Sequence, residues 1–430
     1  RRTIKLFETM FLFFPYDVEA MSSNANNPIG VIGAGTMGTG IAQVIASAGW
    51  PVLLFDIEET LVEQALNNIQ NRFARLVDKG RITLEQAGQW QQLITSTTSM
   101  DDVKDCDLII ESVVEDFGIK SKVLKAICEI APTAIVGTNT SSLSVSKLGE
   151  ASDHPNRVVG MHFFNPAPVM QLIEVVSGKH SSKEAVQRAT LLAEAWDKTV
   201  VHVSDTPGFI VNRVAKPFYL ESWRIVEDGI APIDMVDETL QSLGEFRIGP
   251  FLLMDMIGHD VSVASTRSIW ERLGRPNRLA PSNKQESLVA RGNLGRKTGC
   301  GAYAHDDKDN RVPAILIERQ ELEISDRLVE AINAFCLEAT CLSGSTLEKY
   351  IFTRVLGSII NEAMWTMTEG VANAHDIDTA MQLGMNFPRG PLAWAAKIGI
   401  ENVHNLLAGL NETVTDNRFT APPFGTVSAN

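Results

Sequence analysis

The chain has 430 residues, of which 44% are hydrophobic and 21% are charged, a composition that excludes a disordered or collagen-like protein and predicts two or three domains. Its formal net charge of −14 argues against nucleic acids and anionic membranes as partners. The five cysteines are scattered without paired spacing, which predicts neither a disulfide framework nor a metal site and favours a cytoplasmic protein.

Residues 1–27 precede the first expected strand, and we expect them to be a leader or a disordered segment. Their apolar run, Met10–Phe14, is too short for the hydrophobic region of a signal peptide. No window of the chain approaches the roughly eighteen apolar residues that a membrane-spanning helix needs. The sequence therefore predicts no membrane span.

Residues 28–205 alternate short apolar runs with amphipathic stretches, which is typical of an α/β domain with a parallel sheet covered on both faces. Helices are expected over residues 58–79 and 119–130. The expected strands begin at Ile29, Val52, Asp107, Ala134, Val158, Leu172 and Val200. This pattern predicts a Rossmann-like domain.

The first strand runs into GAGTMG, where three glycines have GxGxxG spacing. Gly33 would permit a tight turn, Gly35 would let the backbone approach a pyrophosphate, and Gly38 would allow close contact between helix and sheet. The N–H groups at the start of the following helix, at Thr36 and Met37, would then hold the phosphates. The loop therefore predicts a dinucleotide site.

Asp56 ends the second strand, eighteen residues after Gly38. A carboxylate at this point accepts hydrogen bonds from the adenosine ribose and repels a 2′-phosphate, which favours NAD over NADP. A role for Asp56 as the N-cap of the next helix is compatible with the same position.

An alcohol-oxidising nicotinamide enzyme needs a base, a group that orients the base, and donors for the forming carbonyl. His162 ends an expected strand at the sheet edge where ligands bind, and Glu174 lies in an apolar strand, where a carboxylate needs a partner. The intervening NPAP turn would fold the chain back and bring them together. Alternatively, His162 is a hydrogen-bonded structural histidine and Glu174 an edge-strand carboxylate in water.

Two loops add further polar side chains near this edge. Ser141 and Ser142 follow the strand AIVGT, where they face the same crevice or cap the next helix. Asn212 is expected one turn into a helix that begins at Pro207. Asparagine has a low helix propensity, so we expect it to have a hydrogen-bonding role.

After Thr206-Pro207-Gly208 the apolar strand pattern stops, and an all-α part is expected. Residues 213–258 align without gaps onto residues 354–399 at an offset of 141, with identities that include Glu221/Glu362, Asp237/Asp378 and Phe246/Phe387. This self-similarity predicts a duplicated helical module. The expected divisions are a first helical domain at 206–303, a linker at 304–345, a second helical domain at 346–415 and a tail at 416–430.

Six motifs in this order, GAGTMG, the Asp56 strand end, NTSS, HFFNPAPVMQLIEV, DTPGFIVNR and LGRKTGCGAY, resemble the 3-hydroxyacyl-CoA dehydrogenase family. The resemblance implies oxidation of an (S)-3-hydroxyacyl-CoA by NAD to a 3-oxoacyl-CoA. It implies His162 as the general base, oriented by Glu174, and Ser141 and Asn212 as contacts of the reacting hydroxyl or carbonyl.

The same resemblance implies further positions around the cofactor and the acyl-CoA. Asn165 would lie beside cofactor and substrate, and Glu115 and Lys120 would lie near the cofactor ribose and nicotinamide. Two more lysines match family positions, Lys297 on the cofactor side and Lys79 at a CoA contact. Arg72 stands where the family has a serine, which weakens the CoA assignment.

The second module resembles that of long bacterial family members acting on 3-hydroxybutyryl-CoA or 3-hydroxyadipyl-CoA, the latter in phenylacetate catabolism. This chain departs from them in a shorter stretch between the copies and a shorter C-terminus, so the sequence does not decide whether the protein forms a homo-oligomer.

A 6-phosphogluconate-type dehydrogenase would use a lysine base and is disfavoured by the HFFNP and NTSS loops. A non-catalytic NAD-binding protein is disfavoured because His162 and Glu174 are both present.

Overall fold

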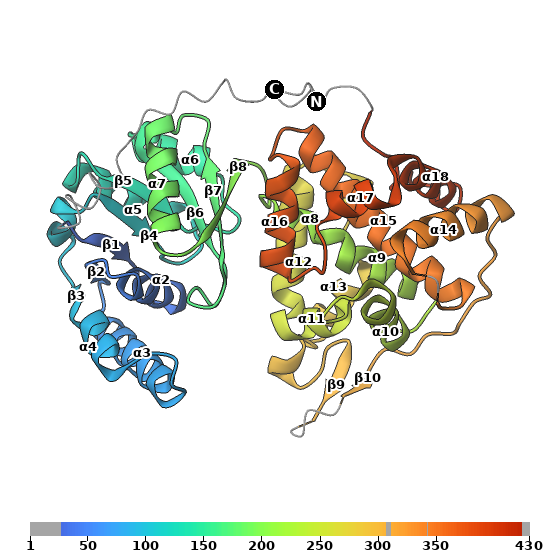
Figure 1. Ribbon diagram of the computed structural model, residues 1–430, viewed down its shortest axis with the longest axis horizontal. Helices are drawn as coiled ribbons and strands as arrows, with labels where there is room; N and C mark the ends of the chain where they lie inside the picture. Colours follow the sequence, from blue (N-terminus) through green and yellow to red (C-terminus); the bar gives the residue numbers. More distant parts are fainter. Residues whose placement is uncertain (1–26, 307–310, 342, 424–430) are drawn as a thin grey trace, which may run out of the picture.

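The computed structural model describes residues 27–306, 311–341 and 343–423, so the expected leader lies outside the described residues except for Asn27. An α/β domain stands beside a larger helical part, and the strand β8 (Thr199–Ser204) leads from the first to the second (Figure 1). Within these residues, no helix is both long enough and apolar enough to cross a membrane.

The α/β domain is built on an eight-stranded sheet in the order β3-β2-β1-β4-β5-β6-β7-β8. The strands are β1 (Ile29–Ile32), β2 (Val52–Phe55), β3 (Ile94–Thr97), β4 (Leu108–Glu111), β5 (Ile135–Thr138), β6 (Val158–Phe163), β7 (Leu172–Ser177) and β8 (Thr199–Ser204). All seven expected strands are present. The sequence analysis missed β3 because this edge strand, ITST, contains a single apolar residue.

The sheet is parallel from β3 to β6, but β7 runs antiparallel to β6 and parallel to β8. This corrects the expectation of a sheet that is parallel throughout. The connection between β6 and β7, residues 164–171, is shorter than the dozen or so residues that a parallel crossover needs. The chain therefore folds back, and the register pairs His162 directly with Glu174.

Helices cover both faces of this sheet, as the continuous apolar runs of the strands predict. In β1, the neighbouring residues Val31 and Ile32 belong to two separate buried clusters. The helices are α2 (Thr36–Ser47), α3 (Glu59–Asp78), α4 (Leu84–Gln92), α5 (Phe117–Ile130), α6 (Val145–Ala151) and α7 (Lys183–Ala195), with short 3₁₀ turns η1 (Met100–Asp105) and η2 (Pro155–Arg157).

The C-terminal part contains two groups of helices and a short hairpin. The helices are α8 (Val211–Val214), α9 (Lys216–Glu227), α10 (Ile233–Gly244), α11 (Pro250–Ile257), α12 (His259–Arg272), α13 (Asn283–Ala290), α14 (Asp326–Ala339), α15 (Thr346–Thr368), α16 (Ala374–Met385), α17 (Pro391–Ile398) and α18 (Ile400–Asn411). The 3₁₀ turns η3 (Asn277–Leu279) and η4 (Arg296–Thr298) and the hairpin β9 (Tyr303–His305) and β10 (Arg311–Pro313) complete it.

The expected helical part is confirmed, with a short two-stranded hairpin added to it, and three finer expectations need correction. Helix α14 lies inside the expected linker and packs against α15 and α18. The first helix begins at Val211 rather than at Pro207, because Gly208 and Phe209 have φ of +82° and +50°, in the left-handed region. The described part of the expected tail, residues 416–423, also packs on the core, because Phe419 is buried.

The duplication is visible in the structure, since α10, α11 and α12 recur as α16, α17 and α18 with starts shifted by 141 residues. Asp237 accepts hydrogen bonds from two N–H groups in the first turn of α11, and Asp378 does the same for α17. A Cβ on Gly249 or Gly390 would overlap these carboxyl groups. The repeated Asp and Gly-Pro residues therefore cap equivalent helices.

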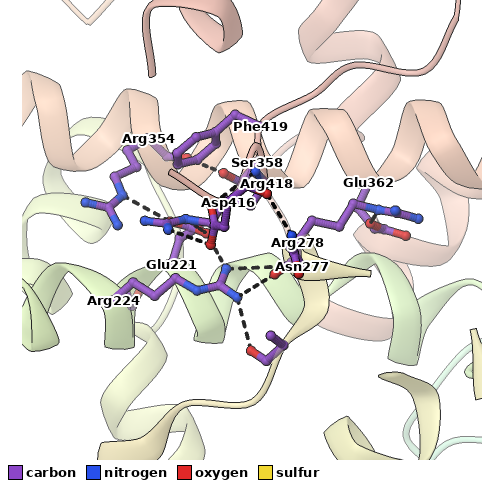
Figure 2. A network of polar contacts seen from close by, with 12 residues as sticks. Glu221, Arg224, Asn277, Arg278, Arg354, Ser358, Glu362, Asp416, Arg418 and Phe419 are labelled. Carbon is purple, nitrogen blue, oxygen red and sulfur yellow. Dashed lines mark hydrogen bonds and ion pairs between the residues drawn. The ribbon is translucent and has the colours of Figure 1, made fainter. Parts of the chain in front are cut away.

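The two modules are joined through buried ion pairs that are exchanged between them. Arg213 of the first module pairs with Glu362 of the second at 2.7 Å, and Arg354 of the second pairs with Glu221 of the first at 3.0 Å. Figure 2 shows the network around Glu221, where Arg418 from the C-terminal segment also contacts this carboxylate. Each module thus supplies the charge that the other needs.

Candidate active site

The glycine loop between β1 and α2 has the shape that a dinucleotide needs. Gly33 has φ of +104°, and a Cβ there would lie 2.6 Å from the Ser112 carbonyl oxygen. A Cβ on Gly38 would lie 1.8 Å from the Gly33 carbonyl oxygen, whereas one on Gly35 would meet nothing within 4 Å. The backbone is therefore open at Gly35, where no side chain caps the start of α2, and Thr36 and Met37 form its first turn.

Asp56 ties the end of β2 to this loop. Its Oδ2 accepts a hydrogen bond from the Ala34 N–H at 2.7 Å, and its Oδ1 accepts one from the Glu58 N–H at 3.2 Å. The N-cap of α3 is Glu58 rather than Asp56, so the carboxylate belongs to the loop. This is the position from which it would reach an adenosine ribose.

Glu115 and Lys120 are brought together beside the loop after β5. Lys120 is buried, with its Nζ 2.7 Å from Glu111 and 3.4 Å from Glu115. Burial alone would raise the pKa of Glu115, but the hydrogen bond from Thr140, the Lys120 charge and the donors of Ser142 and Ser141 outweigh it and lower that pKa. Glu115 is therefore held as a carboxylate.

The sequence analysis missed two polar side chains that hold this region. Glu111 accepts hydrogen bonds from Lys120 at 2.7 Å and from the Thr138 hydroxyl at 2.7 Å. Asn139 accepts one from the Phe163 N–H at 2.9 Å, which links the end of β5 to the end of β6. A glutamate in the otherwise apolar strand LIIE was the one available signal, since a buried carboxylate requires a partner.

His162 and Glu174 lie side by side on β6 and β7. The His162 Nδ1 is 2.6 Å from the Glu174 Oε2, and both side chains are buried. The Glu174 Oε1 accepts hydrogen bonds at 3.0 Å from the N–H groups of Ile210 and Val211, at the start of α8. Because a carboxylate accepts, this contact favours the tautomer with the hydrogen on Nδ1, in which Nε2 can accept a proton.

The remaining reaction-site candidates approach from the loop after β5 and from α8. The Asn212 Nδ2 lies 3.4 Å from the Ser141 carbonyl oxygen, and the Arg272 guanidinium donates to the Ser142 carbonyl oxygen. The Ser141 N–H donates to Glu115 at 2.9 Å. This loop therefore joins the cofactor side of the sheet to the helical part.

The other candidates belong to other elements of the structure. Asn165 is in the connection that follows β6, and Lys297 pairs with both carboxylate oxygens of Asp260 at 2.6 and 2.8 Å. Lys79 is the C-cap of α3, and the Arg72 guanidinium donates to the Gln43 side chain at 3.3 Å. Across the described ranges, neither Lys297 nor Lys79 hydrogen-bonds to the His162–Glu174 pair.

A cavity of about 740 Å³ lies between α2, α3, α4 and the connection that follows β6. Arg72, Arg75 and Arg81 contribute positive charge to its lining, and Trp90 and Trp196 contribute aromatic surface. Such a lining suits an anionic ligand with an aromatic ring. No group of three or more His, Cys, Asp or Glu side chains that would hold a metal occurs in the part of the chain that the structure describes.

Comparison with known proteins gives matches to both parts of the chain. The family model described as "3-hydroxyacyl-CoA dehydrogenase, NAD binding domain" matches residues 28–206. The model described as "3-hydroxyacyl-CoA dehydrogenase, C-terminal domain" matches residues 208–305 and again residues 350–427, so the helical module is found twice.

Several relatives match over most of their own length. The chain is 33% identical to the 3-hydroxyadipyl-CoA dehydrogenase of Escherichia coli K12, covering 91% of this chain and 95% of the relative. It is 37% identical to the 3-hydroxybutyryl-CoA dehydrogenase of Clostridioides difficile, covering 65% and 99%. A crystal structure titled 3-hydroxybutyryl-CoA dehydrogenase from E. coli K12 aligns with a TM-score of 0.81 at 32% identity, covering 92% and 96%. Together, these matches show that the chain belongs to the 3-hydroxyacyl-CoA dehydrogenase family of NAD-dependent oxidoreductases.

Proposed function

We propose that this chain oxidises short (S)-3-hydroxyacyl-CoA thioesters, with His162 as the general base and Glu174 as the residue that orients it. The observation that carries the proposal is the 2.6 Å contact between the two side chains at the carboxyl end of β6. The names of the relatives in C. difficile and E. coli support 3-hydroxybutyryl-CoA and 3-hydroxyadipyl-CoA as the two candidate substrates.

The glycine loop fits the NAD that the family uses. Gly35 leaves open space for a pyrophosphate, and the first turn of α2 supplies N–H donors. The Asp56 carboxylate at the end of β2 would accept hydrogen bonds from the ribose hydroxyls. When bound, NAD supplies the acceptor for the hydride that leaves C3 of the substrate. Glu115 and Lys120 would border the ribose and nicotinamide, with Asn165 and Lys297 on the same side.

His162 would take the proton of the C3 hydroxyl at Nε2 as the carbonyl forms. The imidazolium so produced would lie against the buried Glu174 side chain, whose other oxygen is held by two backbone N–H groups. The helix start at α8 thus orients the carboxylate, and the carboxylate orients the imidazole.

Ser141 and Asn212 would bind the oxygen that changes from hydroxyl to carbonyl. The Ser141 hydroxyl has a long contact of 3.3 Å with Glu115, so it is free to turn toward a better acceptor. The Asn212 amide is held near the Ser141 carbonyl oxygen by a weak contact of 3.4 Å. Donors placed in this way stabilise charge that develops on the oxygen.

The CoA part of the substrate would lie along α3. Lys79 at the end of this helix and Arg72 in the cationic cavity offer charge to the CoA phosphates, and the tryptophans of the cavity offer surface to an adenine ring.

We further propose that the enzyme acts in the cytoplasm, a compartment in which cysteines remain reduced.

Steady-state rates of NADH oxidation test the proposal. Acetoacetyl-CoA, longer 3-oxoacyl-CoAs and a dicarboxylic 3-oxoacyl-CoA would be compared at fixed NADH. We expect turnover of at least one short thioester, with kcat/KM falling for long chains. Failure to oxidise NADH with every member of the series would contradict the proposed activity.

A further inference from the structure

Lys216, the first residue of α9, is a buried lysine that has no carboxylate partner among the described residues. Its side chain is only 4% exposed, and its Nζ donates to the Ser265 hydroxyl at 3.0 Å. Within the described ranges, no carboxylate lies at ion-pair distance from it. Burial lowers the pKa of Lys216 to about 7. A lysine in this setting destabilises the free protein, which suggests that an anion arrives from outside.

The other buried lysines and arginines among the described residues have compensating partners. Lys120, Arg213 and Arg354 each lie within 3.0 Å of a buried glutamate. Lys198 donates to two backbone carbonyl oxygens, at 2.9 and 2.8 Å. Lys216 differs from all of these because the partner that the structure gives it is a single neutral hydroxyl.

The position of Lys216 connects it to the reaction site. It follows Asn212 by four residues in a chain that stays helical through Ala215, so the two side chains are neighbours on one helical face. Ser265 and Arg272 are seven residues apart on α12 and therefore also share a face. Arg272 donates to the Ser142 carbonyl oxygen, and Ser265 meets Lys216. One face of α12 thus extends from the loop of Ser141 and Ser142 to the Lys216 ammonium.

We propose that Lys216 binds a carboxylate at the far end of the acyl chain, so that the preferred substrate is a dicarboxylic 3-hydroxyacyl-CoA of about six carbons. The inference rests on the proposed function, in which Asn212 holds the oxygen on C3. Neighbouring side chains one helical turn apart have Cβ atoms about 5–6 Å apart. A six-carbon chain carries its second carboxyl group over a comparable distance beyond C3. The half-buried Ser265 would then share the ammonium with the incoming carboxylate.

The test compares two substrates of equal carbon number, 3-hydroxyadipyl-CoA and 3-hydroxyhexanoyl-CoA, which differ in a terminal carboxylate or methyl group. We expect the wild-type enzyme to favour the dicarboxylic substrate at least tenfold in kcat/KM. Lys216→Met should reduce that preference by about 10- to 100-fold, the usual worth of a charge-assisted hydrogen bond, and Lys216→Arg should retain most of it. Lys125→Met, the same change at an exposed lysine, should leave the preference unaltered.

A binding measurement gives a second readout that does not require turnover. Adipyl-CoA and hexanoyl-CoA lack the 3-hydroxyl group, and calorimetry on the full chain gives their dissociation constants. Tighter binding of adipyl-CoA that disappears in Lys216→Met supports the proposal. Equal binding of both thioesters, or a preference that survives Lys216→Met, overturns it. Lack of turnover with both 3-hydroxyacyl substrates and with acetoacetyl-CoA would instead contradict the proposed function, and the binding comparison would still decide the role of Lys216.

Discussion

Phe246 and Phe387 are 141 residues apart in the chain, yet their rings meet edge to face with centroids 5.0 Å apart. Each ring follows the left-handed residue that ends its helix, Glu245 after α10 and Asn386 after α16. A contact between equivalent residues lies on the approximate twofold axis that relates two copies of a structure. The exchanged pairs Arg213–Glu362 and Arg354–Glu221 obey the same relation, so the modules pack as the halves of a symmetric dimer would.

The first prediction concerns removal of the second module. A chain that ends at Ile324 keeps the first module and loses α14 to α18, which exposes the faces of α9 and α10 that α15 covers. We expect it to dimerise or aggregate through this apolar surface, as light scattering after size-exclusion chromatography would show. A truncated chain that is monomeric and melts at the temperature of the full chain would show that the first module does not need this partner.

The second prediction concerns the buried Glu221 carboxylate. Burial alone would raise its pKa, but Arg224, Arg354 and Arg418 outweigh burial and lower the pKa of Glu221 to about 2. Because this pKa is lower in the folded than in the unfolded chain, the stabilisation is complete above the ordinary value near 4.5 and is lost as the pH falls toward 2.

Glu221→Gln should therefore lower the free energy of unfolding at pH 7 by about 3–5 kcal/mol, because it also leaves buried arginines without their partner. The difference from the wild type should shrink as the pH falls below about 4.5. Urea unfolding at several pH values measures both effects. Glu412→Gln, which breaks the exposed pair with Arg327, should cost about 1 kcal/mol or less. Equal losses in the two variants would contradict the role of the buried network.

The third prediction concerns cofactor choice. We expect the wild-type enzyme to have a much higher kcat/KM for NADH than for NADPH because the Asp56 carboxylate repels a 2′-phosphate. Asp56→Asn keeps an oxygen that can accept a hydrogen bond from the Ala34 N–H, so the loop should stay in place. Because the substitution removes the charge, the ratio of kcat/KM for NADH to kcat/KM for NADPH should fall. A wild-type enzyme with equal kcat/KM for both cofactors would remove Asp56 from this role.

The α/β domain was predictable because its central strands are continuous apolar runs and its glycine loop has a strict spacing. The edge strand β3 was not predicted because its mostly polar sequence has no hydrophobic pattern. The antiparallel direction of β7 follows from the short connection between β6 and β7. The sequence analysis expected the NPAP turn to fold the chain back, but it did not infer from this that β7 runs antiparallel to β6. Helix α14 was not predicted because it lies outside the repeat. Its residues Leu328, Ile332 and Phe335 nevertheless form an apolar stripe.

Part of the candidate site was also predictable from the sequence. The motif residues could be named, but their hydrogen-bond partners could not, because a bond to a backbone N–H group does not depend on the identity of the donating residue. The two donors at the start of α8 that hold Glu174 are an example. Lys216 is another, since a lysine in the sequence VAKPF carries no sign that its ammonium is buried.

One comparison decides whether His162 is the proton acceptor. The kcat for oxidation of (S)-3-hydroxybutyryl-CoA by NAD would be measured for the wild type, His162→Ala and His180→Ala, a half-exposed histidine that lies 3.7 Å from Glu150. General-base catalysis is worth about 10²- to 10⁴-fold, so His162→Ala should lose that factor while its dissociation constant for NADH stays near the wild-type value. His180→Ala should keep wild-type activity. A His162→Ala enzyme that retains kcat within about tenfold of the wild type would contradict the proposed mechanism.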